Sequence, residues 1–260
     1  MEIKVLGCHG GETPKHRTSS FVLDGKVAID AGAICGGLTL KEQKALRAVM
    51  VSHAHMDHVR DLASLADNRC QMGGTPLVVA GTPWTLRALQ KHFFNNILWP
   101  DFSKIPLSDG GGMTLEWLPM KPEKVYDIGG FRASAVLVTH TIECAAFVAE
   151  RDGTAIAYSG DTGPTDRFWE VLAGVPTLKA LLMEVSFPDD KLWLANASGH
   201  HTPETLNREM EKLNPQHDPR ELPVLLYHIK PHFQREVERQ LAKIKKRSFE
   251  VLSIGDEWIV

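Results

Sequence analysis

The chain has 260 residues, enough for one large domain with a full core or for two small domains. Hydrophobic residues make up 43% and charged residues 23% of the sequence, which excludes a disordered chain. The formal net charge of −3 argues against a nucleic-acid partner, because proteins that grip a phosphate backbone usually carry excess positive charge.

Cysteine usage and apolar runs indicate the environment of the chain. Cys8, Cys35, Cys70 and Cys144 contain no CxxC pair, which argues against a zinc finger or a disulfide framework. We find no signal-peptide pattern at the start, and the longest apolar runs are too short to span a membrane. We therefore expect a cytoplasmic protein with no membrane partner.

Strand and helix patterns alternate along the first part of the chain. Residues 2–6 and 18–30 have strand patterns, and Asp24-Gly25 predicts a hairpin turn within the second segment. Thr39, with Glu42 three residues later, is typical of a capping box and predicts a helix. A buried strand is expected at 48–52 and a helical pattern at 59–66.

Two Thr-Pro pairs predict the first residues of later helices. Thr82-Pro83 starts a helix expected to run to about Ile97, and Thr202-Pro203 starts one at 204–213. A long helix is expected at about 231–246. Further strands are predicted near residues 76–80, 113–118, 131–139, 145–149, 154–159, 179–184, 223–227, 249–253 and 257–260.

The order of these elements predicts the fold class. Strands come in groups separated by helices, which is typical of mixed sheets with helices on their outer faces. Residues 100–112, with three consecutive glycines, predict a surface loop. We find no repeat and no linker, and therefore predict one domain over residues 1–260.

Residues that can bind metal ions cluster directly after the strand predicted at 48–52. The sequence from 52 to 58 is Ser-His-Ala-His-Met-Asp-His, which gives four candidate ligands within six residues. In a loop that leaves a strand, His53 and His55 can point one way while Asp57 and His58 point another. This arrangement suits two adjacent cations, whereas the alternative is a surface histidine cluster without a function.

Three more candidate ligands follow predicted strands. His140 and His228 each end an apolar run, and Asp161 lies in a Gly-Asp-Thr-Gly turn after another. Each has an ordinary alternative, because single histidines are often structural and aspartate is common in turns. Together with the 53–58 segment, they predict a dinuclear metal site.

The order of these residues resembles the metallo-β-lactamase superfamily along the whole chain. The resemblance implies an α/β fold of the αββα sandwich type, two mixed β-sheets face to face with helices outside. It also implies how the metal ligands are shared. His53, His55 and His140 would bind one ion, Asp57, His58 and His228 the other, and Asp161 would bridge them.

Three short motifs resemble class II cyclic-nucleotide phosphodiesterases. They are Glu-Val-Ser-Phe-Pro at 184–188, Gly-His-His-Thr-Pro at 199–203 and His-Ile-Lys-Pro at 228–231. His201 stands where the family usually has leucine, which leaves its role open. The resemblance implies hydrolysis of 3′,5′-cyclic AMP or GMP to nucleoside 5′-monophosphates, and a homodimer.

The chemistry expected of this site is metal-assisted attack on a phosphodiester. Two divalent cations about 3.5–4 Å apart can hold a bridging hydroxide and neutralise phosphate oxygens. Zinc is the preferred metal, and manganese or iron would accept the same ligands. Asp57 and His200 are the predicted catalytic residues. His200 would donate a proton to the leaving oxygen or bind the phosphate, unless it is a supporting or exposed histidine.

Other residues have weaker indications. Glu184 could orient a ligating histidine or be an ordinary strand-end carboxylate. The glycine-rich segment 7–11 could bring N–H groups to an anion, although such segments are usually turns. Phe94, Trp99 and Phe102 could stack a nucleotide base, but core packing is favoured.

The leading hypothesis is a metal-dependent phosphodiesterase with a small-molecule substrate. One alternative is an RNA-processing phosphodiesterase similar to tRNase Z, which the net charge disfavours. Another is a thioester, lactone or sulfate-ester hydrolase on the same scaffold. The third is a non-catalytic protein that binds metal or nucleotide.

Overall fold

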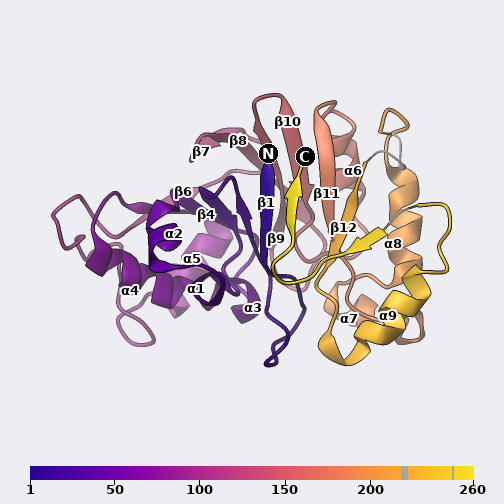
Figure 1. Ribbon diagram of the computed structural model, residues 1–260, viewed down its shortest axis with the longest axis horizontal. Helices are drawn as coiled ribbons and strands as arrows, with labels where there is room; N and C mark the ends of the chain where they lie inside the picture. Colours follow the sequence, from indigo (N-terminus) through magenta and orange to yellow (C-terminus); the bar gives the residue numbers. More distant parts are fainter. Residues whose placement is uncertain (218–221, 248) are drawn as a thin grey trace.

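Two β-sheets form the centre of the computed structural model, which describes residues 1–217, 222–247 and 249–260 (Figure 1). In these residues each sheet has seven strands. The first sheet contains, in spatial order, β14 (Glu257–Ile259), β1 (Glu2–Gly7), β2 (Ser20–Leu23), β3 (Val27–Ile29), β4 (Ala48–Val51), β5 (Leu77–Gly81) and β6 (Leu115–Pro119). The second contains β13 (Phe249–Val251), β12 (Val224–Tyr227), β11 (Leu178–Glu184), β10 (Thr154–Tyr158), β9 (Cys144–Arg151), β8 (Phe131–Val138) and β7 (Tyr126–Ile128).

Both sheets are mixed. Strands β3 to β6 pair in parallel, as do β10 to β13, and the other neighbours pair antiparallel. The carboxyl ends of parallel strands meet at one edge of a sheet. Strand β8 is two antiparallel steps from β10 and therefore runs in the same direction, so its carboxyl end lies at that edge too.

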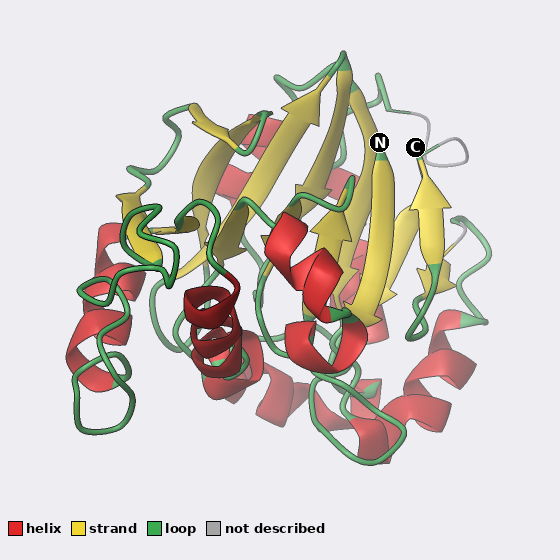
Figure 2. Ribbon diagram, turned by 60° about the vertical axis from the view of Figure 1, so that its left-hand side comes forward, coloured by secondary structure: helices red, strands yellow, loops and turns green. Residues whose placement is uncertain are grey.

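Helices cover the outer faces of both sheets (Figure 1, Figure 2). Those beside the first sheet are α1 (Ile34–Gly37), α2 (Leu40–Ala45), α3 (Met56–Val59), α4 (Leu62–Met72) and α5 (Pro83–His92). Those beside the second sheet are α6 (Asp166–Leu172), α7 (Leu192–Ser198), α8 (Pro203–Glu209) and α9 (Gln234–Leu241), with short 3₁₀ turns η1 (Asp189–Lys191), η2 (Met210–Lys212) and η3 (Pro231–Phe233). This is the predicted αββα sandwich.

The core has three layers, as this architecture requires. A central cluster between the sheets includes Phe21 of the first sheet and Tyr158 and Tyr227 of the second. The two tyrosine rings stack 4.9 Å apart, and Phe21 lies within 5.6 Å of both. A second cluster lies between the first sheet and its helices, and a third lies between the second sheet and its helices.

That residues 1–260 form a single domain stays a prediction.

Local signals for turns and helix starts are confirmed. Strands β2 and β3 pair through a turn in which Asp24 and Gly25 have φ of 46° and 63°. The Thr39 side chain accepts from the Glu42 N–H, and the Glu42 carboxylate accepts from the Thr39 N–H, which completes the capping box of α2. Thr202 and Thr205 form a capping box at α8, and the Thr82 side chain caps α5 by accepting from the Thr85 N–H.

Several predicted helix ends are wrong. Helix α5 ends at His92 instead of Ile97, because Asn95 turns the chain by accepting the N–H groups of Ile97 and Leu98. The helix expected at 231–246 is η3 followed by the shorter α9, and the predicted helix at 204–213 divides into α8 and η2. The strand expected at 249–253 ends at residue 251, and β7, α6 and α7 were not predicted.

The aromatic residues near the predicted loop pack in the core. Phe94 is 1% and Phe102 4% exposed, both in the cluster between the first sheet and its helices. Trp99 packs against that cluster, and its indole N–H donates to the Ala63 carbonyl. Core packing is therefore confirmed for Phe94 and Phe102, whose burial leaves no ring face for a base, whereas Trp99 is partly buried against the same cluster.

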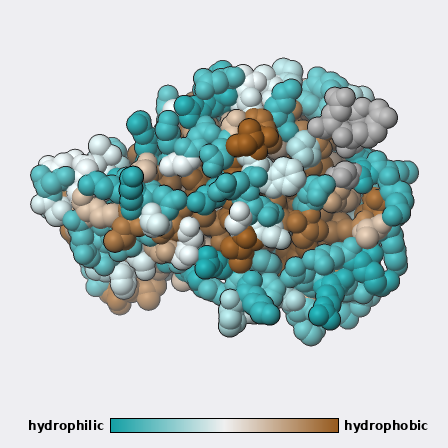
Figure 3. All heavy atoms as spheres, in the orientation of Figure 1, coloured by the Kyte–Doolittle hydropathy of each residue, from teal (hydrophilic) through white to brown (hydrophobic). Residues whose placement is uncertain are grey.

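The surface carries apolar residues in separate groups. On the face shown in Figure 3, small hydrophobic groups lie among hydrophilic side chains. None of the helices described is both long and apolar enough to cross a membrane.

Candidate metal centre

The 53–58 segment leaves β4 and divides its candidate ligands between two directions. His53 lies two residues after the end of β4, and His55 is the N-cap of α3 with extended backbone. The N–H of His58 donates to the His55 carbonyl over 3.0 Å, so Asp57 and His58 lie in a helical turn. This change of backbone gives the two directions that the spacing predicts.

Three imidazoles form the first group of candidate ligands. The Nε2 atom of His53 lies 3.0 Å from His55 Nδ1, and His140 Nε2 lies 3.3 Å from the same atom. His140 follows β8, and its Nδ1 faces the Gly199 carbonyl at 3.0 Å, which fixes the ring orientation. The group therefore contains residues that follow one strand of each sheet.

A carboxylate and two imidazoles form the second group. Asp57 Oδ2 lies 3.4 Å from His228 Nε2 and 4.0 Å from His58 Nε2, and the two histidine Nε2 atoms are 3.4 Å apart. Both His58 and His228 are fully buried, and Asp57 is partly exposed. Each group of three brings its ligand atoms within 4.8 Å of one another.

Asp161 lies between the two groups. Its Oδ2 atom is 3.6 Å from His53 Nε2 and 3.2 Å from the Nε2 atoms of His58 and His228. Its other oxygen, Oδ1, is buried and has no hydrogen-bond partner among the described residues. Burial alone would raise the pKa of Asp161, but the imidazoles of His228 and His58 hold it well below its usual value.

The donor atoms fit divalent cations. Imidazole nitrogens face one another at 3.0–3.4 Å, Asp161 Oδ2 lies within 3.6 Å of three of them, and Asp161 Oδ1 is buried and has no hydrogen-bond partner among the described residues. Burial lowers the pKa of His53 and lowers that of His228 to about 4, so both imidazoles are held neutral, the form that binds metals. Burial also opposes the charged form of His58, yet Asp161 and Asp30 raise its pKa well above 6.5.

Asp30 supports this cluster and was not predicted from the sequence. Its Oδ2 accepts hydrogen bonds from His58 Nδ1 at 2.7 Å, Ser52 Oγ at 2.8 Å and Tyr158 OH at 2.6 Å. It is fully buried and has φ of 56°. Asp30 directly follows β3, so the strand-end criterion that selected His140 would also have selected it.

Glu184 and Ser186 form a second supporting pair. Ser186 Oγ lies 2.8 Å from Glu184 Oε2 and 2.9 Å from His228 Nδ1. Glu184 also accepts from His200 Nδ1 at 3.3 Å and from the N–H of His201 at 2.6 Å. Glu184 therefore contacts His200 directly and reaches the candidate ligand His228 only through Ser186.

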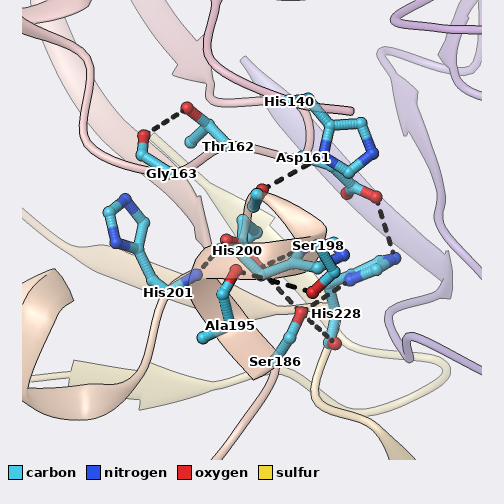
Figure 4. A network of polar contacts seen from close by, with 12 residues as sticks. His140, Asp161, Thr162, Gly163, Ser186, Ala195, Ser198, His200, His201 and His228 are labelled. Atoms are coloured by element: carbon cyan, nitrogen blue, oxygen red, sulfur yellow. Dashed lines mark hydrogen bonds and ion pairs between the residues drawn. The ribbon is translucent and has the colours of Figure 1, made fainter. Parts of the chain in front are cut away.

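His200 and His201 lie differently although they are adjacent. The His200 ring stacks on His228 at 5.1 Å and lies 5.0 Å from His140. Figure 4 shows the His201 ring turned away from that cluster, and its Nδ1 lies 3.1 Å from Thr205 Oγ1. Only His200 is therefore placed beside the candidate metal ligands.

The glycine-rich segment 7–11 packs against the chain that carries His228. The N–H groups of Cys8 and His9 donate to Arg17, and that of Gly10 donates to the Ile229 carbonyl. These three N–H groups are therefore not available to an anion, contrary to the sequence-based suggestion.

Comparisons with known proteins give a family and named relatives. A family model described as beta-lactamase superfamily domain matches residues 33–228. A Yersinia pestis protein named "Probable 3′,5′-cyclic-nucleotide phosphodiesterase" is 26% identical, with 90% of this chain and 80% of that protein covered. An Aliivibrio fischeri protein named "3′,5′-cyclic-nucleotide phosphodiesterase" is 27% identical, with 90% and 81% covered. The crystal structure of unliganded yeast PDE1 has a TM-score of 0.84 at 19% identity, covering 100% of this chain and 99% of that one.

Proposed function

The chain belongs to the β-lactamase superfamily, and from this premise we propose that it is a dinuclear metal-dependent phosphodiesterase that hydrolyses 3′,5′-cyclic nucleotides. The observation that carries the proposal is the position of Asp161 Oδ2 within 3.6 Å of His53 and 3.2 Å of both His58 and His228. One carboxylate oxygen between two ligand groups is the arrangement that two adjacent cations need. The names of the two bacterial relatives support the choice of substrate.

We assign the ligands as two groups that share one residue. The first group is His53, His55 and His140, and the second is Asp57, His58 and His228, with Asp161 common to both. When bound, divalent cations would supply Lewis-acid stabilisation of the phosphate charge and acidify the attacking water. Zinc is the preferred metal for this donor set, with manganese or iron as alternatives.

His200 is assigned to the leaving oxygen. Hydrolysis breaks the bond between phosphorus and the ribose 3′ oxygen, and that oxygen needs a proton as it leaves. Glu184 holds His200 Nδ1 at 3.3 Å, so the opposite nitrogen, Nε2, is the one left to face a substrate. The ring lies beside both ligand groups, because it contacts His140 and His228.

The assignment is tested by metal analysis and a substrate panel. The purified protein is analysed for metal and assayed on 3′,5′-cyclic AMP, 3′,5′-cyclic GMP, an aryl phosphodiester and an RNA with a 3′ extension. Asp57→Ala removes one ligand. Asp127→Ala is the matched control, because Asp127 is an exposed carboxylate of β7 whose Oδ1 accepts from the Gly130 N–H.

The expected result is two metal ions per chain, together with cyclic-nucleotide hydrolysis that Asp57→Ala loses and Asp127→Ala keeps. Turnover of the aryl diester alone would contradict the substrate, and turnover of the RNA alone would favour a tRNase Z-like activity. Absence of bound metal, with no activity after zinc or manganese is added, would contradict the metal centre itself.

A further inference from the structure

His228 has an unusual backbone that the surrounding chain must hold in place. It follows β12 with φ of 70°, a conformation that histidine adopts rarely and that needs support from its surroundings. Its N–H donates to the Cys8 carbonyl over 2.7 Å, and its carbonyl accepts from Ser186 Oγ at 3.2 Å. The position of the imidazole therefore depends on a segment more than two hundred residues earlier in the chain.

Gly10 makes a second contact with the chain around His228. Its N–H donates to the Ile229 carbonyl over 3.1 Å, so the 8–10 segment brackets the His228 peptide. A Cβ atom added at Gly10 would lie 2.4 Å from the His228 carbonyl oxygen and 3.1 Å from His228 Nδ1. The nearest of these atoms belongs to the backbone and cannot rotate away.

The neighbouring glycine, Gly11, is less closely packed than Gly10 and does not contact His228. A Cβ atom at Gly11 would meet only the Pro231 ring, at 3.2 Å and 3.6 Å. Neither Gly10 nor Gly11 has a left-handed backbone, so alanine is compatible with both local conformations. The two positions therefore differ in how closely they approach His228.

We propose that the backbone of residues 8–10 is a positioning element for His228, and that Gly10 is the residue this role requires. The segment fixes the left-handed peptide so that His228 Nε2 points at Asp57 and Asp161. Gly10 is a positioning residue, because it acts through His228 and does not itself reach the cluster. The inference rests on the metal centre proposed above, and it does not depend on the substrate.

The test compares Gly10→Ala with Gly11→Ala in protein loaded with Co²⁺. Cobalt titration followed by visible absorption reports ligand geometry, and metal analysis reports stoichiometry. Gly10→Ala is expected to bind one of two Co²⁺ ions about 10–100-fold more weakly, the usual effect of disturbing a residue that orients a ligand. Gly11→Ala is expected to keep the wild-type spectrum and affinity. A Gly10→Ala protein with unchanged affinity and spectrum would overturn the proposal.

The double variant Gly10→Ala/Lys230→Ala separates two causes. The added Cβ would also lie 2.8 Å from Lys230 Cδ, which is part of a flexible side chain. If His228 is displaced through its backbone, removing the lysine stem leaves the cobalt defect in place. Recovery of wild-type cobalt binding in the double variant would contradict the assignment to His228.

Hydrogen exchange of the wild-type protein provides a test that needs no substitution. Binding Co²⁺ to metal-free protein is expected to slow exchange in residues 7–11 as well as around His228, because coupled sites stabilise each other reciprocally. Slower exchange at His228 without a change in 7–11 would overturn the inference. Wild-type protein that binds two Co²⁺ ions without hydrolysing cyclic nucleotides would contradict only the proposed substrate.

Discussion

Single residues outside the ligand groups orient the histidines of this centre. His58 is oriented by Asp30, His140 by the Gly199 carbonyl and His228 by Ser186. In each case the contact is to Nδ1, so Nε2 is directed at the cluster. Such contacts set the tautomer and the orientation of a ligating imidazole.

Asp30→Asn should weaken metal binding without removing a ligand. His58, the Ser52 hydroxyl and Tyr158 all contact Oδ2, and Oδ1 accepts from the Ser52 N–H at 2.7 Å, so the NH₂ group of asparagine would face a donor in either orientation. We expect metal affinity to fall about 10–100-fold, measured by competition with a chelator of known affinity.

Asp127→Asn is the control for that substitution, because Asp127 is exposed and its Oδ1 bonds the Gly130 N–H within a turn. Its metal affinity should equal that of the wild type. Equal losses in both variants would mean that Asp30 has no particular role in orienting His58.

His200→Leu and His201→Leu should separate the two adjacent histidines. Removing a general acid typically costs about 10²–10⁴-fold in rate, so kcat of His200→Leu should fall in that range while its metal content is kept. The His201 side chain contacts Thr205 away from the cluster, so His201→Leu should retain a kcat close to wild type. Similar losses in kcat, or loss of metal from His200→Leu, would contradict the assigned role.

Helix starts and strand ends were predictable because their causes are local. The caps of α2, α5 and α8 each follow from a threonine and its third neighbour. The structure brings the seven predicted ligands together. The sequence indicated them because apolar runs end shortly before His53, His140, Asp161 and His228, and the other three lie within five residues of His53. The sequence did not show that Asp30 would contact His58 or that Ser186 would contact His228, because these contacts join residues 28 and 42 positions apart in the chain. The need for glycine at position 10 likewise appears only once His228 lies against it.

The capping box of α2 should contribute stability that depends on pH. Hydrogen bonds from the Thr39 side chain and backbone, with a smaller contribution from Lys4, lower the pKa of Glu42 from 4.5 to about 2. On acidification the unfolded chain binds this proton first, so the contribution is complete above about pH 4.5 and is lost as pH falls toward 2. The Glu42→Gln variant should therefore be less stable than wild type, by a difference that shrinks below about pH 4.5.

Urea unfolding of metal-free protein at several pH values measures that difference, with Glu116→Gln as the control. Glu116 is an exposed carboxylate on β6, outside any helix cap. A stability difference for Glu42→Gln that stays constant down to the acid limit of folding would contradict the role of the cap.

At the scale of the whole molecule, the proposed ligands join the two halves of the sandwich. His53, His55, Asp57 and His58 follow β4 in the first sheet. The remaining three follow strands of the second sheet, His140 after β8, Asp161 after β10 and His228 after β12. Bound metal would therefore link the sheets at one edge, in addition to the apolar cluster between them.

Removing metal should lower thermal stability because ions that bind only the folded chain stabilise it by mass action. At a free metal concentration 100 times Kd, one site contributes about 2.7 kcal/mol. Since 1 kcal/mol corresponds to about 2–4 °C in chains of 150–250 residues, chelation should lower Tm by roughly 5–11 °C for each site emptied. Differential scanning calorimetry with and without chelator measures the shift, and metal analysis confirms removal.

Asp161→Asn serves as the control, because it loses the residue common to both ligand groups. Chelator should therefore lower the Tm of this variant much less than that of the wild type. An unchanged wild-type Tm after complete metal removal would mean that the ions do not hold the two sheets together.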